Sequence, residues 1–183
     1  MGNREDLLAG AKRCLVEKGY SRTTARDIAS AAGVSLASIG YHFGSTKALL
    51  NAAVYEAMAE WGEKFGQALA SGDRSFEAIW ARVLDSFRTD RALWRTQIEM
   101  VTQFQHEPEL RGEIAAMQKE GHFALAEMFQ GLRREDDERV ARVAGTFYQV
   151  LLSGLLVQWL VDPELAPTPA ELAEGLRLAV PGR

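Results

Sequence analysis

The sequence predicts an all-α protein with an N-terminal three-helix head of the helix-turn-helix type and a larger C-terminal helical domain. Apolar residues recur at helical spacing along most of the 183 residues, and short segments rich in glycine, proline or charge interrupt this pattern. No run alternates between apolar and polar residues as a β-strand does. We expect the head over residues 1–50 and the helical domain over residues 51–183.

The first helix is expected over residues 4–18, and Gly19 follows it as a stop. One face of this helix is apolar and carries Leu7, Leu8, Ala11, Cys14 and Leu15. Cys14 is the only cysteine, so the chain can form no disulfide within itself. We expect this thiol to be buried as a small apolar group.

The next segment has the pattern of two short helices joined by a tight turn. Thr24 and Asp27 have the spacing of a capping box, which predicts the start of the first short helix. Gly33 can take the left-handed conformation that ends a helix, and Ser35 is placed to cap the second one. This is the helix-turn-helix arrangement, in which the second helix enters the major groove of DNA.

The remaining helices follow from caps and breaks along the chain. Ser45 is expected to cap a long helix that ends near residue 70, with Lys47 in its first turn, where an ammonium can reach a phosphate. Polar or proline-containing segments separate the later helices, which we expect over residues 76–90, 92–105, 109–131, 137–160 and 169–180.

The net charge of −4 is divided unevenly along the chain. Residues 1–50 hold seven basic and four acidic residues, whereas the remainder holds fourteen basic and twenty-one acidic residues. The head therefore carries a charge of +3 and the helical domain one of −7. A basic excess in the helix-turn-helix segment is what a phosphate-binding surface requires.

The segments TTARDIA, AAGVS, SIGYHF and GSTKALL resemble the N-terminal region of the TetR family of bacterial transcriptional regulators. The resemblance implies a DNA-binding head on a helical ligand-binding and dimerisation domain. Two residues depart from the family pattern: Gly40 stands where a second aromatic is usual, and Thr46 stands where a phosphate-binding lysine is commonest. These departures leave open an effector-binding or adaptor protein with weakened or lost DNA binding.

The candidate DNA-binding residues come from the predicted second and third helices and from the start of the fourth. They are Thr24, Arg26, Ser35, Leu36, Ala37, Ser38, Tyr41, His42 and Lys47. The resemblance implies the roles of Arg26, Tyr41, His42 and Lys47. The short side chains at residues 35–38 favour contacts with thymine methyls and hydroxyl contacts over bidentate recognition of guanine.

The segment from Val140 to Trp159 is apolar on nearly every face, so we expect a helix buried on both sides. A homodimer explains this pattern best, with the last two helices packed against their twofold mates in a four-helix bundle. An internal core helix of a monomer is the alternative. The candidate interface residues are Leu151, Leu155, Trp159 and Leu176.

The resemblance implies a ligand cavity in the helical domain, whose bulky rings and methionines can open around a small, mostly apolar effector, although ordinary core is the alternative for each ring. The candidate ligand-binding residues are Trp80, Trp94, Gln97, Met100, Gln103, Phe104, Phe123 and Phe147. Glu99 is a candidate partner for a cationic ligand. The resemblance thus implies a homodimeric repressor that binds a palindromic operator of double-stranded DNA and is released by this effector.

The sequence carries no pattern of an enzyme or of a metal or cofactor site. His106 and His122 lack a third ligand at metal spacing, and no catalytic elbow or phosphate-binding glycine loop occurs. The N-terminal residues lack the apolar run of a signal peptide, and the longest apolar stretch, residues 150–161, is too short to span a bilayer. We therefore expect a cytoplasmic protein that is not an enzyme and has no membrane partner.

Overall fold

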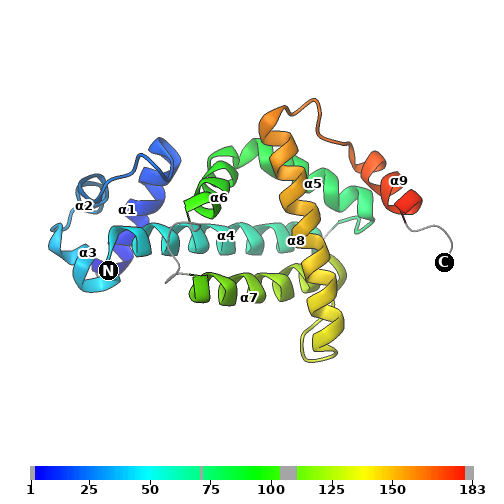
Figure 1. Cartoon of the computed structure of the whole chain (residues 1–183), viewed down its shortest axis with the longest axis horizontal. Helices are drawn as coiled ribbons and strands as arrows, with labels where there is room; N and C mark the ends of the chain where they lie inside the picture. The colour runs from blue at the N-terminus through cyan, green and yellow to red at the C-terminus, as the bar shows by residue number, and fades with distance from the viewer. Residues whose placement is uncertain (1–2, 71, 104–110, 180–183) are drawn as a thin grey trace. The chain divides into compact units, whose positions relative to one another are not determined.

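The computed structural model describes residues 3–70, 72–103 and 111–179, and within them the chain is helical and has no strand, as the sequence predicts (Figure 1). The chain divides into two compact units. The first unit holds residues 1–65 and 90–106, and the second holds residues 66–89 and 107–183. The division differs from a single cut at residue 50, because a helix from the middle of the chain belongs with the head.

The first unit contains α1 (Asn3–Lys18), α2 (Ala25–Ala32), α3 (Ala37–Phe43), most of α4 (Thr46–Ala70) and α6 (Arg91–Gln103). Leucines and small apolar residues of α1, α3 and α4 form one core, and Cys14 is buried in it as expected. Met100 of α6 belongs to the same core and is 1% exposed. The helix α6 is therefore part of the head's packing.

Most helix ends follow the caps in the sequence. Thr24 and Asp27 form the predicted capping box, and Gly33 ends α2 with a left-handed φ of 67°. Ser45 Oγ accepts a hydrogen bond of 3.0 Å from the amide of Ala48 at the start of α4. The predicted cap at Ser35 is wrong: α3 begins one residue later, its N-cap residue is Leu36, and no side chain caps it.

The second unit contains α5 (Phe76–Thr89), α7 (Arg111–Gln130), α8 (Glu138–Val161) and α9 (Pro169–Ala179). The helices α7 and α8 pack against each other, and α9 packs against α5. Gly145 lies where α8 crosses α7: a Cβ atom there would come within 1.8 Å of the backbone oxygen of His122. The absence of a side chain at Gly145 is therefore what allows this crossing.

The apolar helix α8 is buried on one face only. Its buried residues are Ala141, Gly145, Tyr148, Leu152, Leu155, Leu156 and Trp159. The opposite face is exposed and carries apolar residues at alternating spacings of three and four, namely Val140, Val143, Phe147, Val150, Gly154, Val157 and Val161. We call this face the α8 stripe. The prediction that α8 is buried on both sides is thus not met within one chain.

Candidate DNA-binding site

The short helix α3 presents one face to the head's core and another to solvent. Ile39 is 3% exposed and Phe43 packs against the same core, which holds α3 on α1 and α2. Arg4 of α1 stacks its guanidinium over the ring of Phe43 at 5.2 Å. The outward face carries Leu36, which is 50% exposed, and Tyr41, which is 86% exposed. An exposed helix on a packed support has the form of a recognition helix.

The polar residues predicted to bind DNA surround this outward face. Ser35 and Ser38 lie with their hydroxyl oxygens 3.0 Å apart, and the rings of Tyr41 and His42 meet edge to face at 4.8 Å. Arg26 is exposed on α2. Thr24 is also exposed, but its hydroxyl is used in the capping box with Asp27.

Most of the basic residues of the head hold the head together. Lys12 pairs with Glu56 at 2.8 Å and with Glu60 at 2.6 Å, which ties α1 to α4. Arg13 donates to the carbonyl of Ala31, and Arg22 donates to that of Lys18. The charge of +3 is therefore only partly available as a phosphate-binding surface. Arg26, exposed on α2, and Lys47, in the first turn of α4, are the basic residues that the sequence predicts to contact phosphate.

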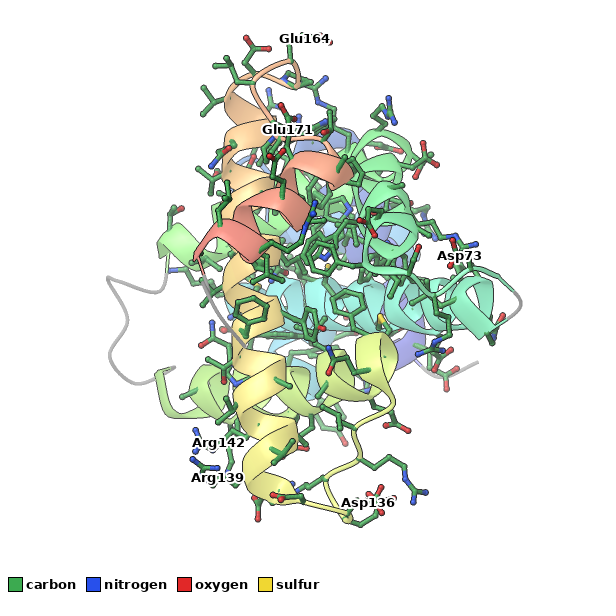
Figure 2. The ribbon with its side chains drawn as sticks, turned by 90° about the vertical axis from the view of Figure 1, so that its right-hand side faces the viewer. Asp73, Asp136, Arg139, Arg142, Glu164 and Glu171 are labelled. Atoms are coloured by element: carbon green, nitrogen blue, oxygen red, sulfur yellow. The ribbon has the colours of Figure 1, made fainter. Side chains whose placement is uncertain are left out.

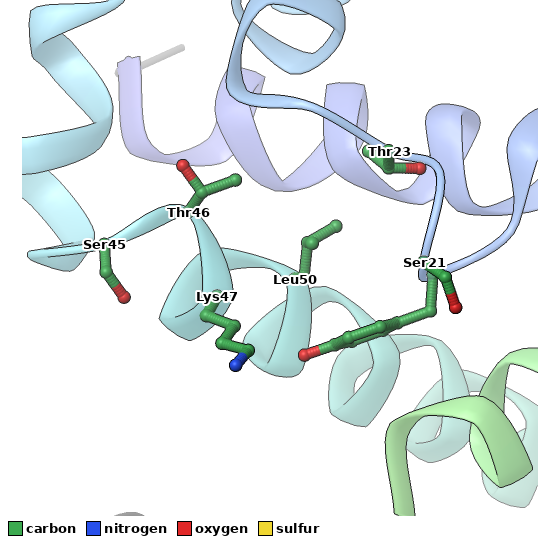
Figure 3. A pocket seen from close by; sticks show the side chains of 7 residues that line it. Ser21, Thr23, Ser45, Thr46, Lys47 and Leu50 are labelled. Carbon is green, nitrogen blue, oxygen red and sulfur yellow. The ribbon is translucent and has the colours of Figure 1, made fainter. Parts of the chain in front are cut away.

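Lys47 lines a surface hollow of about 460 Å³ at the start of α4 (Figure 3). Thr46, Lys47 and Leu50 form one side of it, and the loop between α1 and α2 forms the other. The lining residues are Tyr20, Ser21, Thr23, Ser45, Thr46, Lys47 and Leu50. Hydroxyl groups, the amide groups of a helix start and an ammonium are donors that suit an anionic phosphate oxygen.

Sequence reasoning missed the contribution of Tyr20, Ser21 and Thr23 to this hollow. No local pattern marks them, because the hollow forms only when α4 packs beside a loop more than twenty residues earlier in the chain. The buried hydroxyl of Tyr20 donates to Asn51 Oδ1 at 2.6 Å. Burial raises the pKa of Tyr20 to about 12, so this hydroxyl stays a donor even near pH 10, where a free tyrosine is half ionised.

Glu99 does not have the surroundings expected of a ligand partner. Its Oε2 accepts hydrogen bonds from the amide of Tyr20 at 2.9 Å and from the amide of Ser21 at 3.3 Å. Its other oxygen lies 3.5 Å from Arg95 Nε. The carboxylate thus binds the loop of the head.

The candidate ligand-binding residues are divided between the two units. Trp94, Gln97 and Met100 lie in the first unit, whereas Trp80 and Phe123 lie in the second. Met100 belongs to the head's core, and Phe147 is 41% exposed on the α8 stripe, so we leave both out of the proposed effector site. Phe104 and the side chain of Gln103 lie outside the described residues.

The carboxylate of Asp27 links the end of α1 to the start of α2. It accepts hydrogen bonds from the ammonium of Lys18 and from the amide and hydroxyl of Thr24. The bond from Lys18 and those from Thr24 hold the pKa of Asp27 well below its ordinary value of 3.8. A carboxylate whose pKa is lowered by folding stabilises the fold above its unfolded pKa, and this contribution is lost as the pH falls below it.

We therefore expect Asp27→Asn to lower the melting temperature by a constant amount near neutral pH. This difference from the unaltered protein should shrink as the pH falls below about 4, because Asp27 then gains a proton in the unfolded chain while it stays ionised in the folded one. Melting curves by circular dichroism across a pH series would measure it. A difference that stayed constant down to the lowest pH at which both proteins fold would contradict this role of Asp27.

Comparison with known proteins agrees with this geometry. The family model of bacterial regulatory proteins of the tetR family matches residues 7–53. The model of the tetracyclin repressor-like C-terminal domain matches residues 71–182. The two matches cover both the helix-turn-helix head and most of the chain after it.

Among curated proteins, the chain is 30% identical over 114 residues to the HTH-type transcriptional repressor AcnR of Corynebacterium efficiens, which covers 62% of this chain and 56% of AcnR. It is 33% identical over 86 residues to the HTH-type transcriptional repressor KstR2 of Rhodococcus jostii, which covers 47% of this chain and 42% of KstR2. The chain thus spans about half the length of the curated relatives it matches.

Among solved structures, the fold is similar to that of the multidrug binding protein EbrR complexed with proflavin. The TM-score is 0.68 at 21% sequence identity, and the match covers 98% of this chain and 100% of EbrR. At this identity the likeness concerns the fold. The helix-turn-helix head, the helical body and the two family matches together place the chain in the TetR family of bacterial regulatory proteins.

Proposed function

We propose that this protein is a cytoplasmic transcriptional repressor that binds operator DNA through its head. The observation that carries the proposal is the exposed face of α3, with Leu36 and Tyr41, in the same compact unit as the Lys47 hollow. A groove-reading helix needs such a support, because contacts to phosphates fix its register on the duplex. The repressors AcnR and KstR2 support the direction of regulation.

The two departures from the family pattern are compatible with DNA binding. Gly40 is exposed on α3, and a Cβ atom there would meet nothing within 4 Å, so the missing aromatic leaves open surface and no defect in the core. Thr46 lines the same hollow as Lys47. An ammonium one residue later in the first turn of α4 therefore still reaches the candidate phosphate site.

Replacing Lys47 with alanine tests this site. We expect weaker binding to all duplex sequences alike, and a plot of log K against log salt that is shallower by roughly one, because one phosphate contact is lost. Fluorescence anisotropy with genomic fragments selected by the purified protein would measure both. Lys64→Ala is the control, since Lys64 is an exposed lysine farther along α4 and its loss changes the net charge equally.

Two results would contradict the proposal. If Lys47→Ala and Lys64→Ala had equal effects on the salt dependence, Lys47 would not be a phosphate contact. If the unaltered protein bound no duplex even at low salt, the adaptor alternative would replace the repressor.

The proposed homodimer is supported by the α8 stripe. Its residues repeat at spacings of three and four, which is the pattern of a helix that packs along another helix. Within the described residues, α8 is also the helix long and apolar enough to cross a membrane by length and composition, but core helices of globular proteins share these properties. A second copy of the chain would cover this face, together with the exposed Leu176 and Leu178 of α9.

The interface residues predicted from the sequence need revision in this proposal. Leu155 and Trp159 are 3% and 5% exposed inside one chain, so their side chains are not available to a second one. Leu151 is half-buried and Leu176 is 36% exposed. We place the interface on the α8 stripe instead, with Gly154 near its middle.

The charges at the two ends of α8 favour an antiparallel pair. Arg139 and Arg142 project from its first turns, and Glu164 lies beyond its last turn (Figure 2). In a twofold dimer with antiparallel α8 helices, Arg139 and Arg142 of one helix lie toward Glu164 of its mate. A twofold dimer binds a palindromic operator whose half-sites are about 34–36 Å apart, one turn of DNA.

The proposed effector is a small, mostly apolar molecule. Near the head, Trp61 stacks on Phe65 at 4.9 Å and meets Trp94 edge to face at 4.8 Å. Among the described residues, the buried Gln97 Oε1 of the same unit has no hydrogen-bond partner. Buried polar atoms that lack a partner in the protein are suited to orient a ligand within apolar surroundings.

Titration against tryptophan fluorescence tests the effector class. We expect an apolar compound or a cationic dye to quench the fluorescence and to weaken operator binding by a matching factor, because coupling between two ligands is reciprocal. The Gln97→Leu variant should lose affinity for compounds that carry a hydrogen-bond donor and keep it for those that do not. Tight binding of an acyl-coenzyme A thioester, with no response to apolar compounds, would contradict this class.

A further inference from the structure

The loop between α1 and α2, residues 19–23, is held from three directions. Thr23 Oγ1 donates to the carbonyl of Cys14 at 3.3 Å, which ties the loop to α1. Tyr20 ties it to α4 through the hydrogen bond to Asn51. Glu99 ties it to α6, from a position 79 residues later than Tyr20.

Glu99 accepts hydrogen bonds from two backbone amides of this loop. The amides of Tyr20 and Ser21 both point to Glu99 Oε2, and the hydroxyl of Ser21 lies 3.4 Å from the same oxygen. Three donors on one carboxylate oxygen fix the loop more closely than a single bond does. The nearby Met100 is buried in the head's core, so α6 itself has a fixed position in this unit.

The same loop forms one wall of the Lys47 hollow. Ser21 and Thr23 line the hollow opposite Thr46 and Lys47 (Figure 3). The distance between the loop and the start of α4 therefore sets the shape of the hollow. Because hydrogen bonds to a phosphate weaken steeply with distance and angle, a loop that moves away would leave Lys47 as a lone charge.

We propose that Glu99 is a positioning residue for DNA binding, which acts by holding the loop of residues 19–23 as a wall of the phosphate-binding hollow. The inference rests on the proposed DNA-binding function and adds a residue to it. Glu99 itself does not contact DNA. Its carboxylate is offset by the two backbone amides and by Arg95, so that a negative charge can be kept beside a site for phosphate.

The charge of Glu99 and its hydrogen bonds have opposite effects on DNA binding, and two variants separate them. Glu99→Gln and Glu99→Ala both remove one negative charge, so they change the long-range field equally. Glutamine keeps an oxygen that can accept from the two amides, whereas alanine keeps none. Any difference between the two variants therefore reports the hydrogen bonds to the loop.

The experiment measures binding of a short mixed-sequence duplex to the full-length protein by fluorescence anisotropy at several salt concentrations. We expect Glu99→Ala to bind roughly fivefold more weakly than Glu99→Gln, with a plot of log K against log salt that is shallower by roughly one. In the Lys47→Ala background, the difference between the two variants should vanish, because both act on one phosphate contact.

A merely structural role of Glu99 gives different results. It would lower the melting temperature and leave the salt dependence of DNA binding unchanged. It would also weaken DNA binding by the same factor in the Lys47→Ala background as in the unaltered protein. Either of these two binding results would overturn the proposal. Equal binding by Glu99→Ala and Glu99→Gln would overturn it as well. If Glu99→Ala does not fold, Glu99→Asp replaces it and is compared with the unaltered protein, because aspartate keeps the charge but is one methylene shorter and should hold the loop less well.

DNA binding by the unaltered protein distinguishes an error about Glu99 from an error about the proposed function. If the unaltered protein binds the duplex and the two Glu99 variants do not differ, Glu99 is not a positioning residue and DNA binding stands. If the unaltered protein does not bind the duplex at low salt, the proposed function fails and the inference fails with it.

Discussion

Replacing Gly145 with alanine is expected to destabilise the second unit by about 3 kcal/mol or more, at the upper end of what overpacking of a core costs. The added Cβ would lie 1.8 Å from the backbone oxygen of His122, so α7 and α8 would have to move apart. The neighbouring atom belongs to the backbone and cannot turn away as a side chain can. The higher helix propensity of alanine, worth about 1 kcal/mol, offsets only part of this cost.

Thermal and urea unfolding by circular dichroism would measure the effect. For a chain of this size, 3 kcal/mol corresponds to a fall in melting temperature of about 6–12 °C. Gly121→Ala is the matched control, because Gly121 lies on α7 beside His122 and a Cβ atom there meets nothing within 4 Å. A Gly145→Ala variant as stable as Gly121→Ala would show that the two helices do not cross as described.

Val150→Glu is expected to convert the proposed dimer into a folded monomer. Val150 is 65% exposed in one chain, so a carboxylate there is solvated and costs the fold little. In the proposed dimer the second copy covers the same carboxylate. An unpaired carboxylate that is fully desolvated in this interface weakens the dimer by about 3–5 kcal/mol. The twofold symmetry introduces this cost twice.

Sedimentation velocity would report the oligomeric state, and anisotropy with the selected DNA would report the loss of binding to a full operator. Val16→Glu is the control: Val16 is 62% exposed on α1, and the substitution is chemically the same. A dimer that persisted in Val150→Glu at unchanged affinity would place the interface away from the α8 stripe. Unfolded protein is not expected, because the stripe is exposed in a single chain.

The helices of the head were predictable because their end signals are local. The capping box of Thr24 and Asp27 and the left-handed turn at Gly33 depend on residues three or four apart, so the sequence contains every partner. At Ser35 the local signal did not predict the helix start. Its hydroxyl meets Ser38, and α3 starts one residue later than a serine cap would place it.

The apolar face of α8 that meets the core was not predictable in the same way. With apolar residues around most of the helix, the sequence pattern leaves the buried side undefined. The packing of α7 at Gly145 defines it, which leaves Leu155 inside and Val150 outside. The predicted interface residues Leu155 and Trp159 lie on the buried side for this reason.

By itself, the sequence determined the helical class, the helix-turn-helix head and its family resemblance, because periodicity and caps act over a few residues. Only the tertiary structure decided the composition of the candidate site. Tyr20, Lys47 and Glu99 come from three distant segments, and their meeting depends on how α4 and α6 pack on the head. From the sequence, a glutamate such as Glu99 is expected to be a solvated charge on a helix surface. It can hold the loop only because the fold brings backbone amides from 78 and 79 residues earlier in the chain to its carboxylate oxygen.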